Sequence, residues 1–575
     1  MAVTRKNCFS AIRHSLILAV ITAFALLLAV PASAYASGTG NLTVNAADGS
    51  STEFVAYQIF TADVADGTSG TKTVANIAWA TDIAASVVPE AIKSVNPSES
   101  AANVKDADDA AEWIRNNVQS GSAAAQGSVP NAIASALMQK AANGETLEAG
   151  VPKSLGAGYW IVVNKDSSIG QDQSGTSAIL VVVGGSDVTV AAKSGVPTVE
   201  KQVLEDSNDA WQKQADATAG DDLYWRLDAT VPSILSSYTS YKIVFDDTLG
   251  AGLAEPSDIH VYLAPAAEDI WETGLEVSQG WTELGDEEYT HIYTPAADGG
   301  SFKVALDLVE AVKAHAIDAS QGVQVVVVYD APLSTSLGTG MGNGNVNAVT
   351  LIYPKSTYST ETTTTQGSKA VAYSWNLILT KRDADDGTLL SGAVLRIRDD
   401  KGRYLTPDGT WSSNEATITT GSDGTISVRG VDAGTFTVEE VSAPAGYRAF
   451  AGTRTITLAV PYEPNQIVSG PATGTPAEAE LSAESPLKTS GFDSASGMAT
   501  VSVPNAHEET SILEKLGLPD MSDLNPSGLA LGLVLLGAAV LIAAIVLRRR
   551  GETSIRHGRG MPKTSRDCRQ TYVHV

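Results

Sequence analysis

The chain has 575 residues, and 65 Asp and Glu against 38 Lys and Arg give it a formal net charge of −27. An acidic surface repels the phosphate backbone, which argues against nucleic acid as a partner. The histidines and cysteines show no metal-ligand spacing, and no phosphate-binding glycine loop or nucleophile elbow occurs. We therefore expect no metal, no cofactor and no enzymatic activity.

The first segment, residues 1–36, is typical of a secretory signal peptide. Basic residues precede an apolar run over 16–30, and Ala32–Ala34 or Ala34–Ala36 offers a small-residue cleavage site. A retained anchor helix is the alternative, but the run is short for a membrane span. Between Cys8 and Cys568 there is no cysteine, so disulfides cannot stabilise the exported part.

The next segment, residues 37–195, is expected to be a sheet domain with a helical insertion. Strand-like patterns lie at 42–44, 54–60, 158–163 and 178–183. An alanine-rich stretch between 85 and 145 predicts helices, including 106–118 and 132–142.

A second module is expected over residues 196–355, followed by a Thr/Ser-rich linker at 356–370. The patterns predict strands at 197–203, 223–231, 242–245, 323–329 and 347–353. Residues 302–316 are expected to be helical.

The third module is expected over residues 371–510. Strands are predicted at 376–381, 393–398, 425–428, 434–441 and 498–505, and a long loop or insertion at 464–495. Short strands separated by Gly-containing turns are typical of a β-sandwich. The predicted fold class is therefore mainly β, with tandem immunoglobulin-like β-sandwich modules, the first of which carries the helical insertion.

The C-terminal part predicts a membrane anchor. Residues 511–528 form a short stalk, and 529–547 are wholly apolar or glycine. Arginines begin the tail at 548–575 directly afterwards. A run of this length can cross a bilayer as one transmembrane helix, and the positive charge places the tail in the cytoplasm.

Motifs in all three modules carry a resemblance to a known family. They are Tyr57–Phe60 and Gly158–Trp160 in the first, Pro197–Lys201, Phe245–Leu249 and Gly344–Leu351 in the second, and Leu379–Lys381, Leu390–Ala393 and Gly434–Tyr447 in the third. On these motifs the chain resembles the sortase-assembled major pilin, the backbone subunit, of Gram-positive bacteria. The second module is similar to the isopeptide-forming fimbrial domain, and the third to the B-type domain of collagen adhesins.

The resemblance implies self-catalysed Lys–Asn amide bonds. It pairs Lys201 with Asn347 in the second module and Lys381 with Asn505 in the third, and it assigns none to the first. Burial lowers the pKa of a lysine and frees its lone pair for attack. Enforced proximity adds effective molarities of about 10⁵ M or more.

A protonated carboxyl group beside the carboxamide polarises the carbonyl and helps ammonia to leave. The family pattern assigns this role to Asp247, with Asp246 as the alternative. In the third module Glu440 is preferred to Glu439, because alternation from Phe436 turns Glu440 inward.

Polymerisation in the family uses a lysine near the end of the first domain. Lys193 lies at that position, just before the second module. Lys355 lies in a literal Tyr-Pro-Lys, but after the second module. Position favours Lys193, because this lysine must meet the next subunit at a fixed junction, and Lys355 stays the alternative.

The sorting signal departs from the family pattern. Sortases recognise Leu-Pro-x-Thr-Gly before the span, and here only Leu518 and Pro519 are retained. The related Met561–Ser565 lies beyond the arginines, on the cytoplasmic side. Either the sortase is unusual or the protein remains tethered to the membrane.

The resemblance implies a covalent pilus shaft subunit that mediates adhesion. Its expected partners are other pilin subunits, sortase, peptidoglycan, and a host or extracellular-matrix ligand. The expected location is a wall-anchored surface pilus, with the precursor held in the plasma membrane. The alternative is a monomeric anchored adhesin, in which the insertion at 85–145 forms the ligand surface.

Overall fold

The computed structural model describes residues 38–508, apart from 48, 50, 98–102, 119–123, 141–142, 267–272, 298, 335–336, 341–342 and 463–478. The predicted signal peptide, stalk, sorting motif, transmembrane segment and tail lie outside the described residues. Within the described ranges no helix is long and apolar enough to span a membrane. These residues divide into two compact units, 38–444 with 449–505, and 445–448 with 506–508.

The first module has two sheets and a group of helices. One sheet has the order β5-β1-β8, and the other has the order β3-β2-β6-β7, with β4 also paired to β2. The strands are β1 (Thr39–Asn45), β2 (Glu53–Asp66), β3 (Lys72–Trp79), β4 (Glu145–Glu148), β5 (Lys153–Gly156), β6 (Gly158–Val163), β7 (Ile179–Val183) and β8 (Val188–Ala191). The helices are α1 (Asp82–Val95), α3 (Ala107–Asn117) and α4 (Val129–Lys140).

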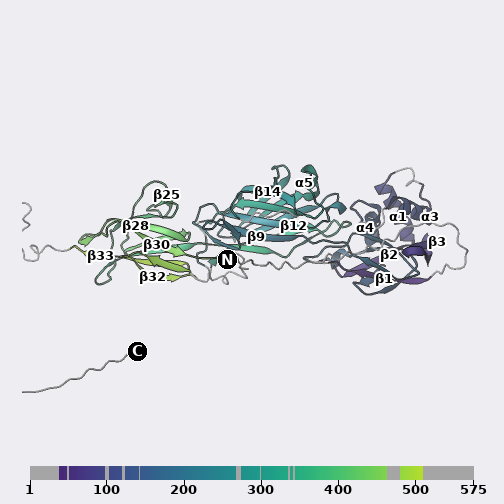
Figure 1. The fold of residues 1–575 in the computed structure, drawn as a ribbon, viewed down its shortest axis with the longest axis horizontal. Coiled ribbons are helices and arrows are strands. Elements are labelled where there is room, and N and C mark those ends of the chain that lie inside the picture. The colour runs from purple at the N-terminus through teal and green to yellow at the C-terminus, as the bar shows by residue number, and fades with distance from the viewer. Residues whose placement is uncertain are drawn as a thin grey trace, which may run out of the picture. The chain divides into compact units, whose positions relative to one another are not determined.

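Strand β2 separates two cores in this module. Val55, Tyr57 and Ile59 belong to the core that includes the helices. Phe54 and Ala56 belong to the core beneath the three-stranded sheet. Successive side chains on a strand point to opposite faces, so one buried strand serves both layers. Figure 1 shows α1, α3 and α4 gathered beside β2 and β3.

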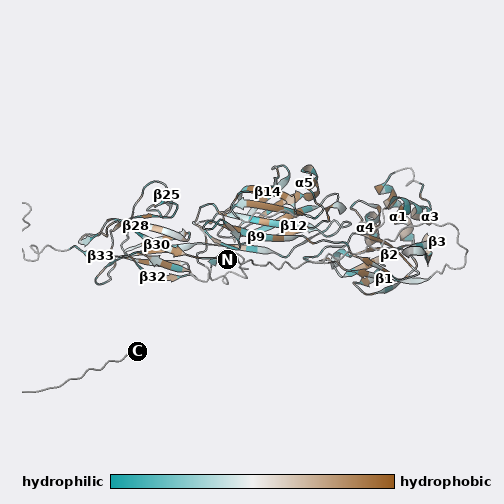
Figure 2. Cartoon of the chain, in the orientation of Figure 1, coloured by the Kyte–Doolittle hydropathy of each residue, from teal (hydrophilic) through white to brown (hydrophobic). Residues whose placement is uncertain are grey.

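The second module is a β-sandwich. One sheet has the order β10-β9-β12-β18-β14-β15, and the other β11-β21-β19-β13-β17-β16, with β20 paired to β19. The strands are β9 (Thr198–Glu205), β10 (Ala210–Gln212), β11 (Gln214–Asp216), β12 (Tyr224–Val231), β13 (Lys242–Gly250), β14 (Ser257–Pro265), β15 (Thr282–Glu283), β16 (Tyr289–Ala296), β17 (Gly299–Asp307), β18 (Val323–Asp330), β19 (Asn345–Pro354), β20 (Thr362–Thr364) and β21 (Ser368–Tyr373). Inward side chains of both sheets form one continuous core, and hydrophobic residues concentrate along these strands in Figure 2.

Two segments of this module differ from expectation. The helix predicted over 302–316 is wrong for its first part: Phe302, Val304 and Leu306 point inward from β17, and only α5 (Leu308–Ala314) is helical. The segment forms a strand because its backbone pairs on both sides, with β13 and with β16. Residues 356–370, for which a linker was expected, contain β20 and part of β21, and both strands pair with β19.

The third module also packs two sheets around one core. Strands β27, β22 and β33 are neighbours in one sheet, with β32 paired to β33. The other sheet has the order β25-β24-β23-β28-β30-β31, with β26 paired to β23. The strands are β22 (Trp375–Asp383), β23 (Val394–Arg398), β24 (Tyr404–Leu405), β25 (Trp411–Ser412), β26 (Ile418–Thr419), β27 (Thr425–Val431), β28 (Gly434–Ser442), β30 (Thr453–Ala459), β31 (Glu480–Ala483), β32 (Lys488–Asp493) and β33 (Met498–His507).

The long loop predicted at 464–495 is wrong in its second part, where β31 pairs with β30 and β32 with β33. In the small second unit, β29 (Tyr447–Arg448) pairs with residues 506–507 of β33. The mainly β fold class is confirmed by these sheets.

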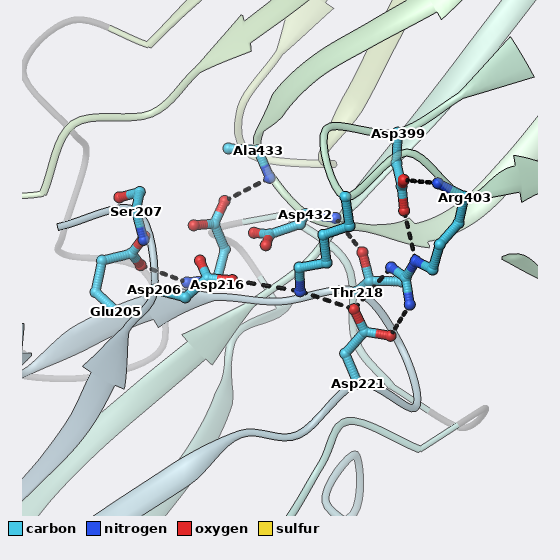
Figure 3. A network of polar contacts seen from close by, with 11 residues as sticks. Glu205, Asp206, Ser207, Asp216, Thr218, Asp221, Asp399, Arg403, Asp432 and Ala433 are labelled. Carbon is cyan, nitrogen blue, oxygen red and sulfur yellow. Dashed lines mark hydrogen bonds and ion pairs between the residues drawn. The ribbon is translucent and has the colours of Figure 1, made fainter. Parts of the chain in front are cut away.

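A polar network joins strands of the second and third modules (Figure 3). The Asp216 carboxylate accepts hydrogen bonds from the Trp375 indole and, at 3.1 Å, from the Ala433 backbone N–H. Asp221 receives two hydrogen bonds from the Arg403 guanidinium, at 2.6 and 2.7 Å. A bidentate pair of this kind fixes both distance and orientation.

Acidic groups in the same network carry raised pKa values. Burial, with repulsion by Glu205, raises the pKa of Asp216 well above its usual range. Burial and repulsion by Asp216 do the same for Asp432, whose ordinary value is 3.8, and Lys401 offsets only part of this. An acid whose pKa is raised on folding contributes stability that is complete below its unfolded pKa and lost as pH rises through the folded pKa.

Candidate functional site

The predicted lysine, acid and asparagine of the second module meet in its core. Lys201 points inward from β9 in one sheet, whereas Asp247 on β13 and Asn347 on β19 point inward from the other. All three residues are fully buried. Each strand alternates buried and more exposed positions, so the sandwich itself aims these polar side chains at one another.

Distances define how these groups interact. Lys201 Nζ lies 2.9 Å from Asp247 Oδ1 and 2.7 Å from Oδ2. It also donates to the Tyr329 hydroxyl at 2.9 Å, and that hydroxyl donates to Asp247. Asn347 Nδ2 donates to the same hydroxyl at 2.7 Å. Tyr329 is therefore the group that links the carboxamide to the amine and the acid.

Burial dominates the electrostatics of this site. It lowers the pKa of Lys201 to about 8, although attraction to Asp247 acts in the opposite direction. It raises the pKa of Asp247, against the attraction of Lys201. Both shifts favour a neutral amine beside a neutral acid, the protonation states that an attack on a carboxamide requires.

The neighbouring Asp246 faces away from this core. Its carboxylate pairs with Lys303 at 2.9 Å, and about a third of its side chain (29%) is exposed. Alternation along β13 turns Asp247 inward and Asp246 outward. The geometry thus favours Asp247 over Asp246 as the acid.

The third module holds a similar group on a different arrangement of strands. Lys381 on β22 and Asn505 on β33 lie on adjacent parallel strands, while Glu440 reaches them from β28 in the other sheet. Lys381 Nζ contacts Asn505 Oδ1 and lies 2.9 Å from Glu440 Oε1. Asn505 Nδ2 donates to that same Glu440 oxygen at 2.8 Å.

Local contacts fix the acid and the amine of this group. The other Glu440 oxygen accepts a hydrogen bond from the Phe450 backbone N–H at 3.0 Å. Burial lowers the pKa of Lys381, and the Glu440 carboxyl acts in the opposite direction. The alternative acid, Glu439, instead pairs with Arg396 at 2.6 Å on the outer face of β28. The geometry favours Glu440.

The two candidate assembly lysines differ in their surroundings. Lys193 lies on the connection between β8 and β9, where the residue is open to solvent on one side, and partial burial of its ammonium lowers its pKa. The Lys355 ammonium is held by the Asp166 carbonyl at 3.1 Å and by the Glu361 carboxylate at 2.9 Å. Leu518 and Pro519 lie outside the described residues.

Comparison with known proteins identifies one domain. Residues 376–467 match the family model SpaA, the prealbumin-like fold domain. This match covers the strands of the third module from β22 to β30, including Lys381 and Glu440. No curated protein matches the chain.

The chain is also similar to solved structures of Gram-positive major pilins. The T6 backbone pilin of Streptococcus pyogenes has 14% identity and a TM-score of 0.48, over 83% of this chain and 100% of that chain. SpaD of Corynebacterium diphtheriae has 16% identity and a TM-score of 0.42, over 82% and 98%. BcpA of Bacillus cereus has 12% identity and a TM-score of 0.38, over 82% and 99%.

Sequence reasoning did not single out Tyr329. It lies in the strand predicted at 323–329, where every residue of β18 is buried. A tyrosine in such an apolar strand carries no spacing signal. Its role becomes visible only when β18 faces β13 and β19 across the core.

Proposed function

We propose that this protein is a structural subunit of a covalently polymerised surface pilus, stabilised by self-formed Lys–Asn isopeptide bonds. The observation that supports the proposal is the occurrence, in two modules, of a buried lysine in hydrogen-bond contact with a buried acid, next to a buried asparagine. The bonds would join Lys201 to Asn347 and Lys381 to Asn505.

The third module illustrates the reaction. The neutral Nζ of Lys381 attacks Cγ of Asn505, and one Nζ proton passes to Glu440. Glu440 gives its own proton to Nδ2, the Cγ–Nδ2 bond breaks, and ammonia leaves. The acid is regenerated and no oxidant is consumed. Its contacts of 2.9 Å to the amine and 2.8 Å to the leaving nitrogen suit both proton transfers.

The buried lysine–acid pairs are not explained by a contribution of the ion pair to folding stability. Removing a lysine and a carboxylate from water costs more than a single pair usually returns, and apolar residues of similar size are often more stable. The amide product carries no charge, so the reaction removes this cost. A crosslink also does what disulfides do in other exported proteins, in a chain whose exported part has no cysteine.

The exposed Lys193 is the amine that we propose for assembly. Two hydrogen bonds hold the Lys193 backbone. Its N–H donates to Thr176 Oγ1 at 2.8 Å, and its carbonyl accepts from the Ser177 N–H at 2.9 Å. In the proposed reaction a sortase acyl-enzyme, formed on the C-terminal segment of another subunit, is attacked by Lys193. We propose that the assembled pilus is attached to peptidoglycan at the cell surface and binds a host or matrix ligand.

A denaturing gel of surface extracts tests the polymer. The wild-type protein should give a ladder of high-mass species, and Lys193→Ala should give monomer with both internal bonds intact. Lys355→Ala is the matched control and should retain the ladder. The reverse result would assign assembly to Lys355. A wild-type protein that runs as one band and is released by detergent alone would favour the tethered adhesin and contradict the pilus.

A further inference from the structure

The two candidate sites deliver their acid to the carboxamide in different ways. In the third module one oxygen of Glu440 contacts both the attacking amine of Lys381 and the leaving nitrogen of Asn505, at 2.9 and 2.8 Å. This acid needs no intermediary.

In the second module, among the described residues, no hydrogen bond joins the acid directly to the carboxamide. Both oxygens of Asp247 contact Lys201 Nζ, and one also accepts from Tyr329. Among the described residues, the only side-chain hydrogen bond of Asn347 runs from Nδ2 to the Tyr329 hydroxyl, and its Oδ1 has no partner. The Tyr329 oxygen therefore lies between the acid and the leaving nitrogen.

We propose that Tyr329 is a catalytic residue of the second module, and that it relays a proton from Asp247 to the leaving nitrogen of Asn347. The inference rests on the proposed function, since it concerns how one of the two bonds forms. The third module needs no such residue, because Glu440 itself contacts the leaving nitrogen of Asn505.

Asp247 and Tyr329 each accept one proton and give one proton during the relay. Lys201 Nζ attacks Cγ of Asn347, and one Nζ proton passes to Oδ1 of Asp247, 2.9 Å away. The proton carried by Oδ2 of Asp247 moves to the Tyr329 oxygen as the Tyr329 proton moves to Nδ2. The Cγ–Nδ2 bond breaks and ammonia leaves, with Asp247 and Tyr329 restored to their starting states.

The surroundings of Tyr329 suit a relay. Burial, followed by the negative charge of Asp247, raises its pKa well above the usual range, so the hydroxyl stays protonated. Its ring packs edge-on against Phe302 with centroids 4.9 Å apart. Strand β18 pairs with both β12 and β14, which fixes the position of the hydroxyl.

The test follows both bonds in the same molecule. The full chain is synthesised in a short pulse, and samples are denatured and digested at intervals. Peptide mass spectrometry then measures the fractions joined at Lys201–Asn347 and at Lys381–Asn505. Tyr329→Phe should slow the first bond by about 100-fold or more, the lower range for general acid–base catalysis. The second bond should form at the wild-type rate.

Two further variants separate chemistry from folding. Tyr353→Phe removes another buried hydroxyl of this module, which donates to the Gln173 carbonyl at 2.9 Å, and should leave both rates unchanged. The double variant Asp247→Glu with Tyr329→Phe gives the acid one more methylene, so that it reaches the carboxamide as Glu440 does. It should recover much of the lost rate.

The outcomes distinguish the inference from the proposed function. If Tyr329→Phe forms the Lys201–Asn347 bond at the wild-type rate, the relay is wrong and the isopeptide account stands. The relay is also wrong if Tyr329→Phe is slow, the double variant recovers no rate and the second module becomes protease-sensitive. Tyr329 would then be a structural residue. Absence of both bonds in the wild-type chain would overturn the proposed function itself.

Discussion

Replacing Lys381 with methionine isolates the contribution of the covalent bond in the third module. Lys381 and Asn505 are 124 residues apart, and the chain-entropy model gives a crosslink over such a loop about 4–5 kcal/mol. Methionine keeps the apolar stem of the fully buried side chain, so repacking should cost less than about 1.5 kcal/mol. We expect a total loss of about 4–6 kcal/mol, which lowers the melting temperature of this module by roughly 15–25 °C.

Scanning calorimetry of residues 37–510, the part that we propose is exported, measures this shift. The transition of the third module should move down while that of the second stays in place. Lys488→Met replaces an exposed lysine on β32 and should leave both transitions unchanged. An unchanged melting temperature for Lys381→Met would mean that no crosslink closes this module.

Two further predictions concern the acids. Asp247→Asn and Glu440→Gln should each lose only one ammonia molecule relative to their own sequence masses, and the matching lysine should become reactive to amine reagents after denaturation. A variant that still loses two ammonia molecules would move the role to another acid. Asp432→Asn should raise the melting temperature near pH 7 and flatten its fall with rising pH, since the raised pKa of Asp432 makes its ionisation unfavourable in the folded protein. The prediction would be wrong if the difference in melting temperature between Asp432→Asn and the wild type were the same at pH 5 and at pH 8.

The fold could be predicted well where one face of a strand is buried. The alternation at 434–441 predicts β28, because a period of two distinguishes the core from the outer face. The helix prediction was wrong at 302–307. Alanine and leucine there also suit a helix, but the segment forms β17, which pairs with a strand on each side. Pairing partners far along the chain are not visible in a local pattern.

The candidate site could be predicted in its residue types but not in its connections. Alternation from Phe436 placed Glu440 on the buried face of its strand, whereas Lys201 was assigned by the family resemblance, and the structure buries both. The sequence could not reveal that the Tyr329 hydroxyl hydrogen-bonds both to Asp247 and to the carboxamide of Asn347, because three strands from two sheets create those contacts. The bonds themselves and the assembly lysine stay predictions.

The intact mass of residues 37–510 reports directly whether the two proposed crosslinks form. This part of the chain, purified and fully denatured, should be lighter than its sequence mass by two ammonia molecules. Digestion should yield two branched peptides, one joining Lys201 to Asn347 and the other joining Lys381 to Asn505. The full sequence mass, with all four residues recovered in linear peptides, would contradict the account.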